Sequence, residues 1–147
     1  MLSRTGQSQE LLKGPAAYGF LISLATILWW RSEGAVFTIV PLCMGDGASG
    51  LFGHLYGRMR LPWNREKTWL GTFSFFIFAV VSSVLMHFFF SWNGWVPVPY
   101  QKYADAMPYY ASIASVVVTA MMVESLPLRD WDNLTVFITC AMLYQLI

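Results

Sequence analysis

The amino-acid sequence predicts an all-α, polytopic membrane protein that forms a bundle of about five transmembrane helices. Of its 147 residues, 56% are hydrophobic and only 12% are charged, whereas about one quarter of an average soluble chain is charged. Long apolar runs without charges alternate with short polar segments. The net charge of +1 gives no field that would gather a polyanion, and this composition argues against an ordinary soluble domain, a disordered chain and a nucleic-acid-binding protein.

Five apolar runs are candidate spans, because a bilayer core about 30 Å thick needs roughly 20 helical residues. After a polar lead of residues 1–13, they are residues 14–30, 34–45, 69–90, 107–123 and 134–147. Residues 69–90 form the clearest span. Residues 34–45 are too short to cross unaided, so they must tilt, continue into the next segment or be buried among other helices. The last run stops at the final residue, which indicates either a short last helix or a truncated chain.

The sidedness follows from counting the crossings. If all five runs cross, the lead, a loop at residues 46–68 and a loop at residues 124–133 share one face. All nine Lys and Arg residues except Arg31 and Lys102 then lie on that face, which favours it as the cytosol-like side. The same parity brings Asp46, Lys67 and Glu124 together with Asp132.

The first polar cluster is Asp46 with its neighbours Gly45 and Gly47. An unpaired carboxylate at the end of an apolar run is costly and is a candidate functional group. Glycines let the backbone approach a ligand closely, and their N–H groups would face an anion. The alternative is that Asp46 caps the following helix, on which small residues form a packing face. Those small residues are Ser49, Gly53 and Gly57.

The second cluster is basic and comprises Arg58, Arg60, Arg65 and Lys67. One interpretation is attraction to anionic lipid, with nearby tryptophans at the interface. The other concerns Lys67-Thr68 and Gly71-Thr72 at the start of the clearest span, because an ammonium group and hydroxyl donors suit phosphate oxygens.

The third cluster holds Glu124, Asp130, Asp132 and Asn133. Oxygen ligands opposite a basic loop indicate phosphate bridged by Mg²⁺. The alternative is a solvated loop in which Asp130 or Asp132 caps the last helix. Elsewhere, His87 is expected to bond a neighbouring helix, and Cys43 and Cys140 are expected to be small buried hydrophobic residues.

The three clusters, in this order, resemble the polyprenol kinase family, which includes dolichol, phytol and farnesol kinases. The similar motifs are Glu10-Leu11-Leu12-Lys13-Gly14-Pro15, Gly45-Asp46-Gly47 with Gly53 and Gly57, Leu61-Pro62 with Asn64, Lys67-Thr68-Trp69-Leu70-Gly71-Thr72, Glu124-Ser125-Leu126-Pro127 and Asp132-Asn133-Leu134-Thr135-Val136. The plant phytol and farnesol kinase branch is nearest, which implies a plastid membrane. The family usually has further N-terminal spans, so the resemblance also implies a truncated member. Plant members commonly differ at Gly50, His54 and Trp131, where they carry an acid, an arginine and an aspartate, and this difference implies weaker metal binding here.

The resemblance implies transfer of a phosphoryl group from CTP, UTP or ATP, with Mg²⁺ or another divalent cation, to phytol, farnesol or a related prenol. Asp46 and Lys67 would be the catalytic residues. Asp46 would bind the metal or accept the alcohol proton, and Lys67 would hold phosphates. Arg58 or Arg65 would help to hold phosphates, together with Gly45, Gly47, Ser49, Gly53, Gly57, Thr68, Gly71 and Thr72. Glu124, Asp132 and Asn133 would complete the metal shell. The alternatives are a lipid-phosphate cytidylyltransferase and a catalytically degenerate member with a packing role in the membrane.

Overall fold

The computed structural model describes residues 8–30, 32–95, 106–128 and 131–146. These residues are organised by helices: α1 (Ser8–Leu28), α2 (Glu33–Val40), the π-helical turn η1 (Pro41–Gly45), α3 (Asp46–Tyr56), α4 (Trp69–Trp92), α5 (Ala106–Glu124) and α6 (Asp132–Leu146). Because α2, η1 and α3 join into one uninterrupted helix, Glu33–Tyr56, the described part of the chain forms five helices. The predicted all-α class is confirmed, and the five helices overlap the five apolar runs.

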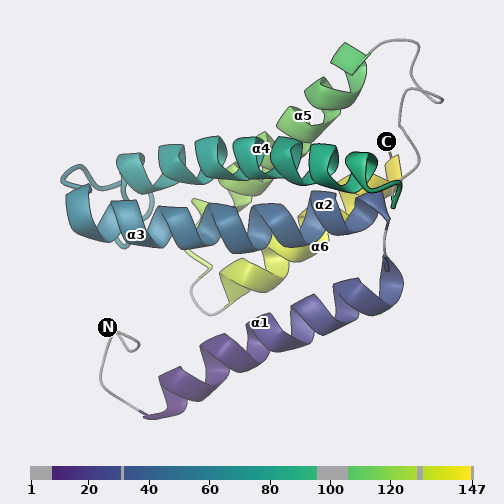
Figure 1. Cartoon of the computed structure of the whole chain (residues 1–147). Helices are drawn as coiled ribbons and strands as arrows, with labels where there is room; N and C mark the ends of the chain where they lie inside the picture. Colours follow the sequence, from purple (N-terminus) through teal and green to yellow (C-terminus); the bar gives the residue numbers. More distant parts are fainter. Residues whose placement is uncertain (1–7, 31, 96–105, 129–130, 147) are drawn as a thin grey trace.

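Successive helices alternate in direction (Figure 1). The start of α1, the α3–α4 connection and the α5–α6 connection lie at one end of the bundle, on the left of the view. The α1–α2 turn and the end of α6 lie at the other end. The continuous helix packs along α4, and α5 packs against both α4 and α6. This arrangement has the parity that the sequence predicts, although Arg4, Arg31, Lys102, Arg129 and Asp130 lie outside the described residues.

The prediction that residues 46–68 form a loop is wrong for residues 46–56, which are helical. The apolar run at residues 34–45 does not end at Gly45 but continues through η1 into α3, and the chain leaves the helix only at Gly57. Asp46 is therefore inside a long helix, and the structure shows no side-chain cap at the start of α3. The helix persists through a glycine-rich stretch because that stretch packs closely on α4.

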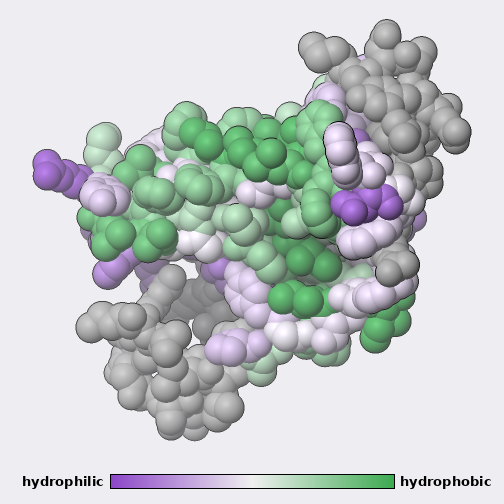
Figure 2. Space-filling view, in the orientation of Figure 1, coloured by the Kyte–Doolittle hydropathy of each residue, from purple (hydrophilic) through white to green (hydrophobic). Residues whose placement is uncertain are grey.

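Two of the described helices, Glu33–Tyr56 and Trp69–Trp92, are long and apolar enough to cross a membrane. Pro15–Leu28 and Pro108–Glu124 are shorter apolar stretches. Much of the outward surface of α4 is hydrophobic, and Figure 2 shows the broad green face to which it contributes. Exposed large side chains recur along that helix at Phe73, Ile77, Val81, Leu85 and Phe88. Such a continuous apolar exterior fits a lipid environment better than water.

The interior of the bundle is rich in aromatic side chains. Phe75 of α4 is fully buried, and Phe37 of α2 packs edge-on against Tyr109 of α5 with ring centroids 5.8 Å apart. His87 is buried in α4 and its Nδ1 lies 3.1 Å from the Tyr109 hydroxyl oxygen, which confirms that it bonds a neighbouring helix. Both cysteines are free; Cys140 is buried as predicted, whereas Cys43 is only half-buried.

Candidate functional site at the loop end of the bundle

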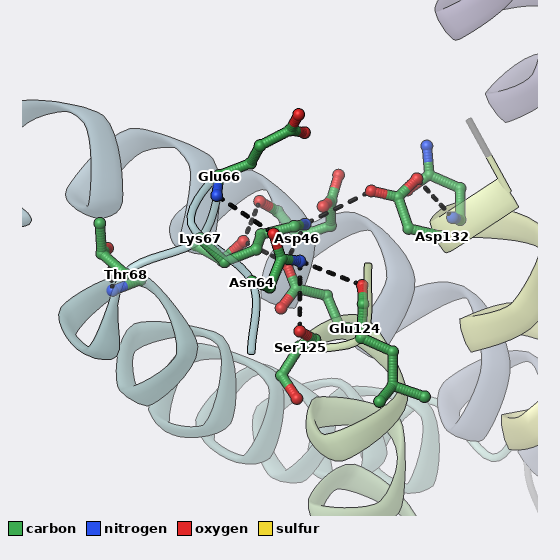
Figure 3. Close-up of polar contacts among 12 residues, drawn as sticks. Asp46, Asn64, Glu66, Lys67, Thr68, Glu124, Ser125 and Asp132 are labelled. Atoms are coloured by element: carbon green, nitrogen blue, oxygen red, sulfur yellow. Dashed lines mark hydrogen bonds and ion pairs between the residues drawn. The ribbon is translucent and has the colours of Figure 1, made fainter. Parts of the chain in front are cut away.

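Lys67 lies between two acids that come from different helices. Its Nζ is 2.5 Å from Oε1 of Glu124 at the end of α5 and 3.3 Å from Oδ2 of Asp132 at the start of α6. Figure 3 shows these side chains and Asp46 meeting from four segments of the chain. The ion pairs tie the α3–α4 connection to the α5–α6 connection.

Glu124 is the most deeply buried member of this cluster, with 1% of its side chain exposed. Its Oε1 also accepts a hydrogen bond of 3.0 Å from the Ser49 hydroxyl of α3. Its Oε2 is buried and has no hydrogen-bond partner among the described residues. A buried carboxylate normally has both oxygens satisfied, so Oε2 is available to a ligand, a water molecule or a proton.

Asp46 extends from the first turn of α3 toward the same cluster. Its carboxylate is close enough to interact electrostatically with Lys67, Glu124 and Asp132. Its Oδ2 accepts a hydrogen bond from the hydroxyl of Tyr18 on α1. The cluster therefore joins four helices, α1, α3, α5 and α6, to the loop before α4 and concentrates three carboxylates around one ammonium group.

The charge of Lys67 is set by its neighbours. Burial alone would lower the pKa of its ammonium group, but the negative charge of Glu124, followed by those of Asp132 and Asp46, raises that pKa above its ordinary value. Lys67 is therefore cationic at neutral pH. An ammonium group has three donors, so its two ion pairs leave one donor for a further acceptor.

The position of Lys67 depends on Asn64, to which the sequence analysis assigns no role. The Asn64 amide donates to the carbonyl oxygens of Ser125 at 3.2 Å and Leu126 at 3.1 Å, and its Oδ1 accepts from the backbone N–H of Glu66 at 3.1 Å. The loop is thereby tied to the segment after α5 (Figure 3). A polar residue in the middle of a loop with a proline and a tryptophan could have signalled this anchor, but no spacing rule identifies its partner.

The glycines predicted to bind phosphate fall into two groups. Four of them are packing positions, because a Cβ atom added there would lie very close to a neighbouring atom. A Cβ at Gly45 would lie 2.9 Å from the Phe75 ring, and one at Gly53 would lie 3.3 Å from the Cα of Gly71. A Cβ at Gly57 would lie 2.3 Å from the Gly53 carbonyl oxygen, and one at Gly71 would lie 2.9 Å from the Ser49 carbonyl oxygen. This close helix contact is the small-residue face that the sequence predicts as one alternative. Gly47, in contrast, has open space around its Cα.

The two predicted hydroxyl donors also differ in position. Thr68 is buried, and its Oγ1 accepts a hydrogen bond of 3.1 Å from the Gly71 N–H, so it caps α4. Thr72 lies one turn further on, and its Oγ1 is buried without a hydrogen-bond partner in the described structure. Thr68 thus acts in the structure as a helix cap, while the Thr72 hydroxyl remains available.

A pocket with a volume of about 250 Å³ lies beside Lys67. It is lined by the α3–α4 and α5–α6 connections through Trp63, Asn64, Arg65, Glu66, Lys67, Leu126, Pro127 and Asp132. Arg65 is exposed at this pocket, and Arg58 is exposed outside its lining. The structure therefore brings Arg65, but not Arg58, next to the acidic cluster.

The acids do not form a ready-made metal cage. No group of three or more His, Cys, Asp or Glu side chains in the described ranges is placed to hold a metal ion, and Lys67 lies between Glu124 and Asp132. Asn133 donates its backbone N–H to Oδ1 of Asp132 at 3.0 Å, as expected if Asp132 supports the start of α6. A Mg²⁺ ion usually takes only one or two carboxylates and completes its shell with substrate phosphates, and this cluster can supply those carboxylates.

The three positions at which the resemblance implies a difference from plant members are all exposed. Gly50 and His54 lie on α3, and Trp131 precedes α6. Gly50 has nothing within 4 Å of where a Cβ would be. None of the three makes a contact that holds the cluster together.

The sequence has relatives among plant kinases. It is 30% identical to phytol kinase 1, chloroplastic, of Arabidopsis thaliana over 138 residues, which are 92% of this chain and 43% of that protein. It is 31% identical to farnesol kinase, chloroplastic, of Arabidopsis thaliana over 96% of this chain and 45% of that protein. It is 34% identical to the probable phytol kinase 2, chloroplastic, of Oryza sativa subsp. japonica over 99% of this chain and 47% of that protein. The chain spans less than half the length of these relatives, and neither a family model nor a solved structure matches it.

Proposed function

This chain is homologous to the plant phytol and farnesol kinases, and from that relationship we propose that it takes part in phosphoryl transfer from a nucleoside triphosphate to a prenyl alcohol in a membrane. The observation that carries the proposal is the convergence of Asp46, Lys67, Glu124 and Asp132 at one end of an apolar bundle. Since the relatives are named as chloroplastic proteins, the proposed location is a plastid membrane.

The physical setting suits this reaction. A prenyl alcohol dissolves its tail in the bilayer and carries one hydroxyl, so that hydroxyl must meet a water-soluble nucleotide where the spans end. Phosphoryl transfer needs positioning and neutralisation of charge more than covalent participation by the protein. A cluster of fixed charges at a loop end, beside a pocket of about 250 Å³, provides both.

The proposed roles follow from the contacts. Asp46 accepts the proton of the alcohol, because its Oδ2 already accepts a hydrogen bond from a hydroxyl on the apolar helix α1, that of Tyr18. Lys67 offers its third donor to a phosphate oxygen, and exposed Arg65 adds a second cation beside the pocket. Gly47, with open space at its Cα, allows a phosphate to approach the backbone, and the free hydroxyl of Thr72 is a further donor.

With Asp46 as the base, a divalent cation would be held by Asp132 together with the nucleotide's own phosphates, with Glu124 and Asn133 as the remaining predicted ligands. When bound, it would neutralise the charge of the transferred group. Without it, Lys67 supplies the positive charge against which the phosphates are oriented.

A packing role for the chain is the second candidate, favoured by the glycine contacts between α3 and α4. The deciding experiment incubates the purified chain in liposomes with Mg²⁺, labelled farnesol, phytol or geranylgeraniol, and CTP, UTP or ATP. The expected result is a prenyl monophosphate and an equal amount of nucleoside diphosphate. Pyrophosphate formed with a prenyl phosphate would instead indicate cytidylyl transfer, and the absence of product with every pair would favour the packing role.

A further inference from the structure

Among the described side chains of α1, Tyr18 is the one that bonds to the charged cluster. Its phenol donates to Oδ2 of Asp46, although 28 residues separate the two in the chain. Tyr18 is half-buried and packs at the edge of the hydrophobic core. A hydroxyl group carried on an apolar helix is thus bound to the carboxylate that is proposed to receive the alcohol proton.

The chemistry of this contact is that of the acceptor substrate. A prenyl alcohol also presents a single hydroxyl on an apolar body, and a base must hydrogen-bond that hydroxyl before it can take its proton. Tyr18 therefore marks the position and direction from which a hydroxyl reaches Asp46.

α1 is attached to the rest of the bundle along one narrow face. Among its side chains that the structure describes, Leu21 and Ala25 are buried, whereas Phe20, Ile22, Ile27 and Leu28 are exposed. Figure 1 shows α1 at the outside of the bundle, where it packs mainly against α2 and α6. An outer helix with few buried side chains can shift at low cost, because exposed apolar side chains that face lipid have no hydrophobic driving force toward the bundle.

We propose that the contact between Tyr18 and Asp46 is the acceptor subsite: the hydroxyl of an isoprenoid alcohol replaces the Tyr18 hydroxyl on Asp46, and the isoprenoid tail lies against α1. This inference rests on the proposed function. In the transfer, the alcohol oxygen forms a bond to the γ-phosphorus while the bond from that phosphorus to the β,γ-bridging oxygen breaks. The electron pair leaves on the nucleoside diphosphate, and the alcohol proton passes to Asp46.

The kinetic test is Tyr18→Phe, which keeps the ring and its packing but removes the competing hydroxyl. The KM for farnesol should fall by about tenfold while kcat is retained, because the alcohol no longer has to displace a hydrogen bond to a charged group. Tyr56→Phe, which removes the hydroxyl of an exposed tyrosine on α3, is the matched control and should change neither constant. A fall in kcat at constant KM would overturn the subsite, since it would show that Tyr18 only positions Asp46.

A binding measurement separates the subsite from the proposed function. Labelled farnesol is bound to nanodiscs that hold the chain, without nucleotide, and binding to empty nanodiscs is subtracted. Tyr18→Phe should lower the Kd by about tenfold and Asp46→Leu should raise it, since a hydrogen bond to a charged group contributes about 1.5–3 kcal/mol. Binding with this pattern but without phosphoryl transfer would refute the function and keep the subsite. Transfer with a Kd that Tyr18→Phe leaves unchanged would refute the subsite alone.

Discussion

Lys67 and Glu124 form an ion pair of 2.5 Å across 57 residues of sequence, and Glu124 is almost completely buried. The pair holds the loop before α4 against the end of α5. Because one partner has no access to water, its charge depends on the other for compensation, which makes the pair the most sensitive point of the cluster.

Replacing Lys67 by Met should therefore destabilise the fold strongly. An uncompensated buried carboxylate costs about 3–5 kcal/mol, whereas the double variant Lys67→Met with Glu124→Leu should recover most of that loss. Asp132→Asn is the control, because Asp132 is partly exposed and such a pair contributes at most about 1 kcal/mol. Unfolding in mixed detergent micelles measures all three, and equal losses for Lys67→Met and Asp132→Asn would contradict the prediction.

The same pair predicts a dependence on alkaline pH. Since the pKa of Lys67 is raised in the folded chain from its ordinary value of 10.5, the stabilisation is fully present below that value. It is lost as the pH rises through the raised pKa, where the ammonium group gives up its proton. Lys67→Arg keeps its charge throughout this range.

The test is to measure unfolding of the wild type and of Lys67→Arg from pH 9 upward in parallel. Subtracting one profile from the other removes the titration of tyrosines, which both proteins share. The wild type should lose stability relative to Lys67→Arg only above the ordinary lysine pKa. Parallel profiles would show that the ion pair does not contribute.

Asp46→Asn should remove the proposed phosphoryl transfer without removing the fold. The amide oxygen can still accept the Tyr18 hydrogen bond, but it cannot take a proton, and loss of a general base typically lowers the rate by about 10²–10⁴-fold. Glu33→Gln, an acid at the opposite end of the same long helix, is the control and should keep its activity. Retained turnover in Asp46→Asn membranes at wild-type expression would exclude the proposed role.

The glycines of α3 should separate packing from ligand approach. Gly57→Ala places a Cβ atom 2.5 Å from Oγ1 of Thr68, the N-cap of α4, and should cost about 1–3 kcal/mol, as overpacking usually does. Gly47→Ala meets no neighbouring atom and should stabilise the helix by about 0.5–1 kcal/mol. Thermal unfolding of the two variants compares them directly, and a stable Gly57→Ala protein would show that α3 and α4 are less closely packed than described.

The five helices could be predicted from the sequence because each overlaps a long run of apolar residues that carries few or no charges. The passage of one helix through Asp46 could not. Single-sequence reasoning treats glycine, aspartate and serine as residues that end helices, and it has no access to the contact between Gly53 and Gly71 that favours small side chains there.

The grouping of Lys67 with Glu124 and Asp132 could be anticipated from the parity of the crossings, because charges at the same end of antiparallel helices have few other partners. Tyr18 could not be anticipated. One tyrosine in an apolar run has the same appearance as a tyrosine that anchors a helix at the membrane interface. Only the three-dimensional arrangement shows that its hydroxyl reaches Asp46.

The π-helical turn at Pro41–Gly45 sets the rotational phase of everything that follows it. Each residue advances an α-helix by about 100°, and a π-helical turn holds one residue more than the α-helical turn it replaces. Asp46 and Ser49 come immediately after this turn. The wider turn takes in one extra residue within a single revolution, so Asp46 and Ser49 keep the rotational position that faces Lys67 and Glu124.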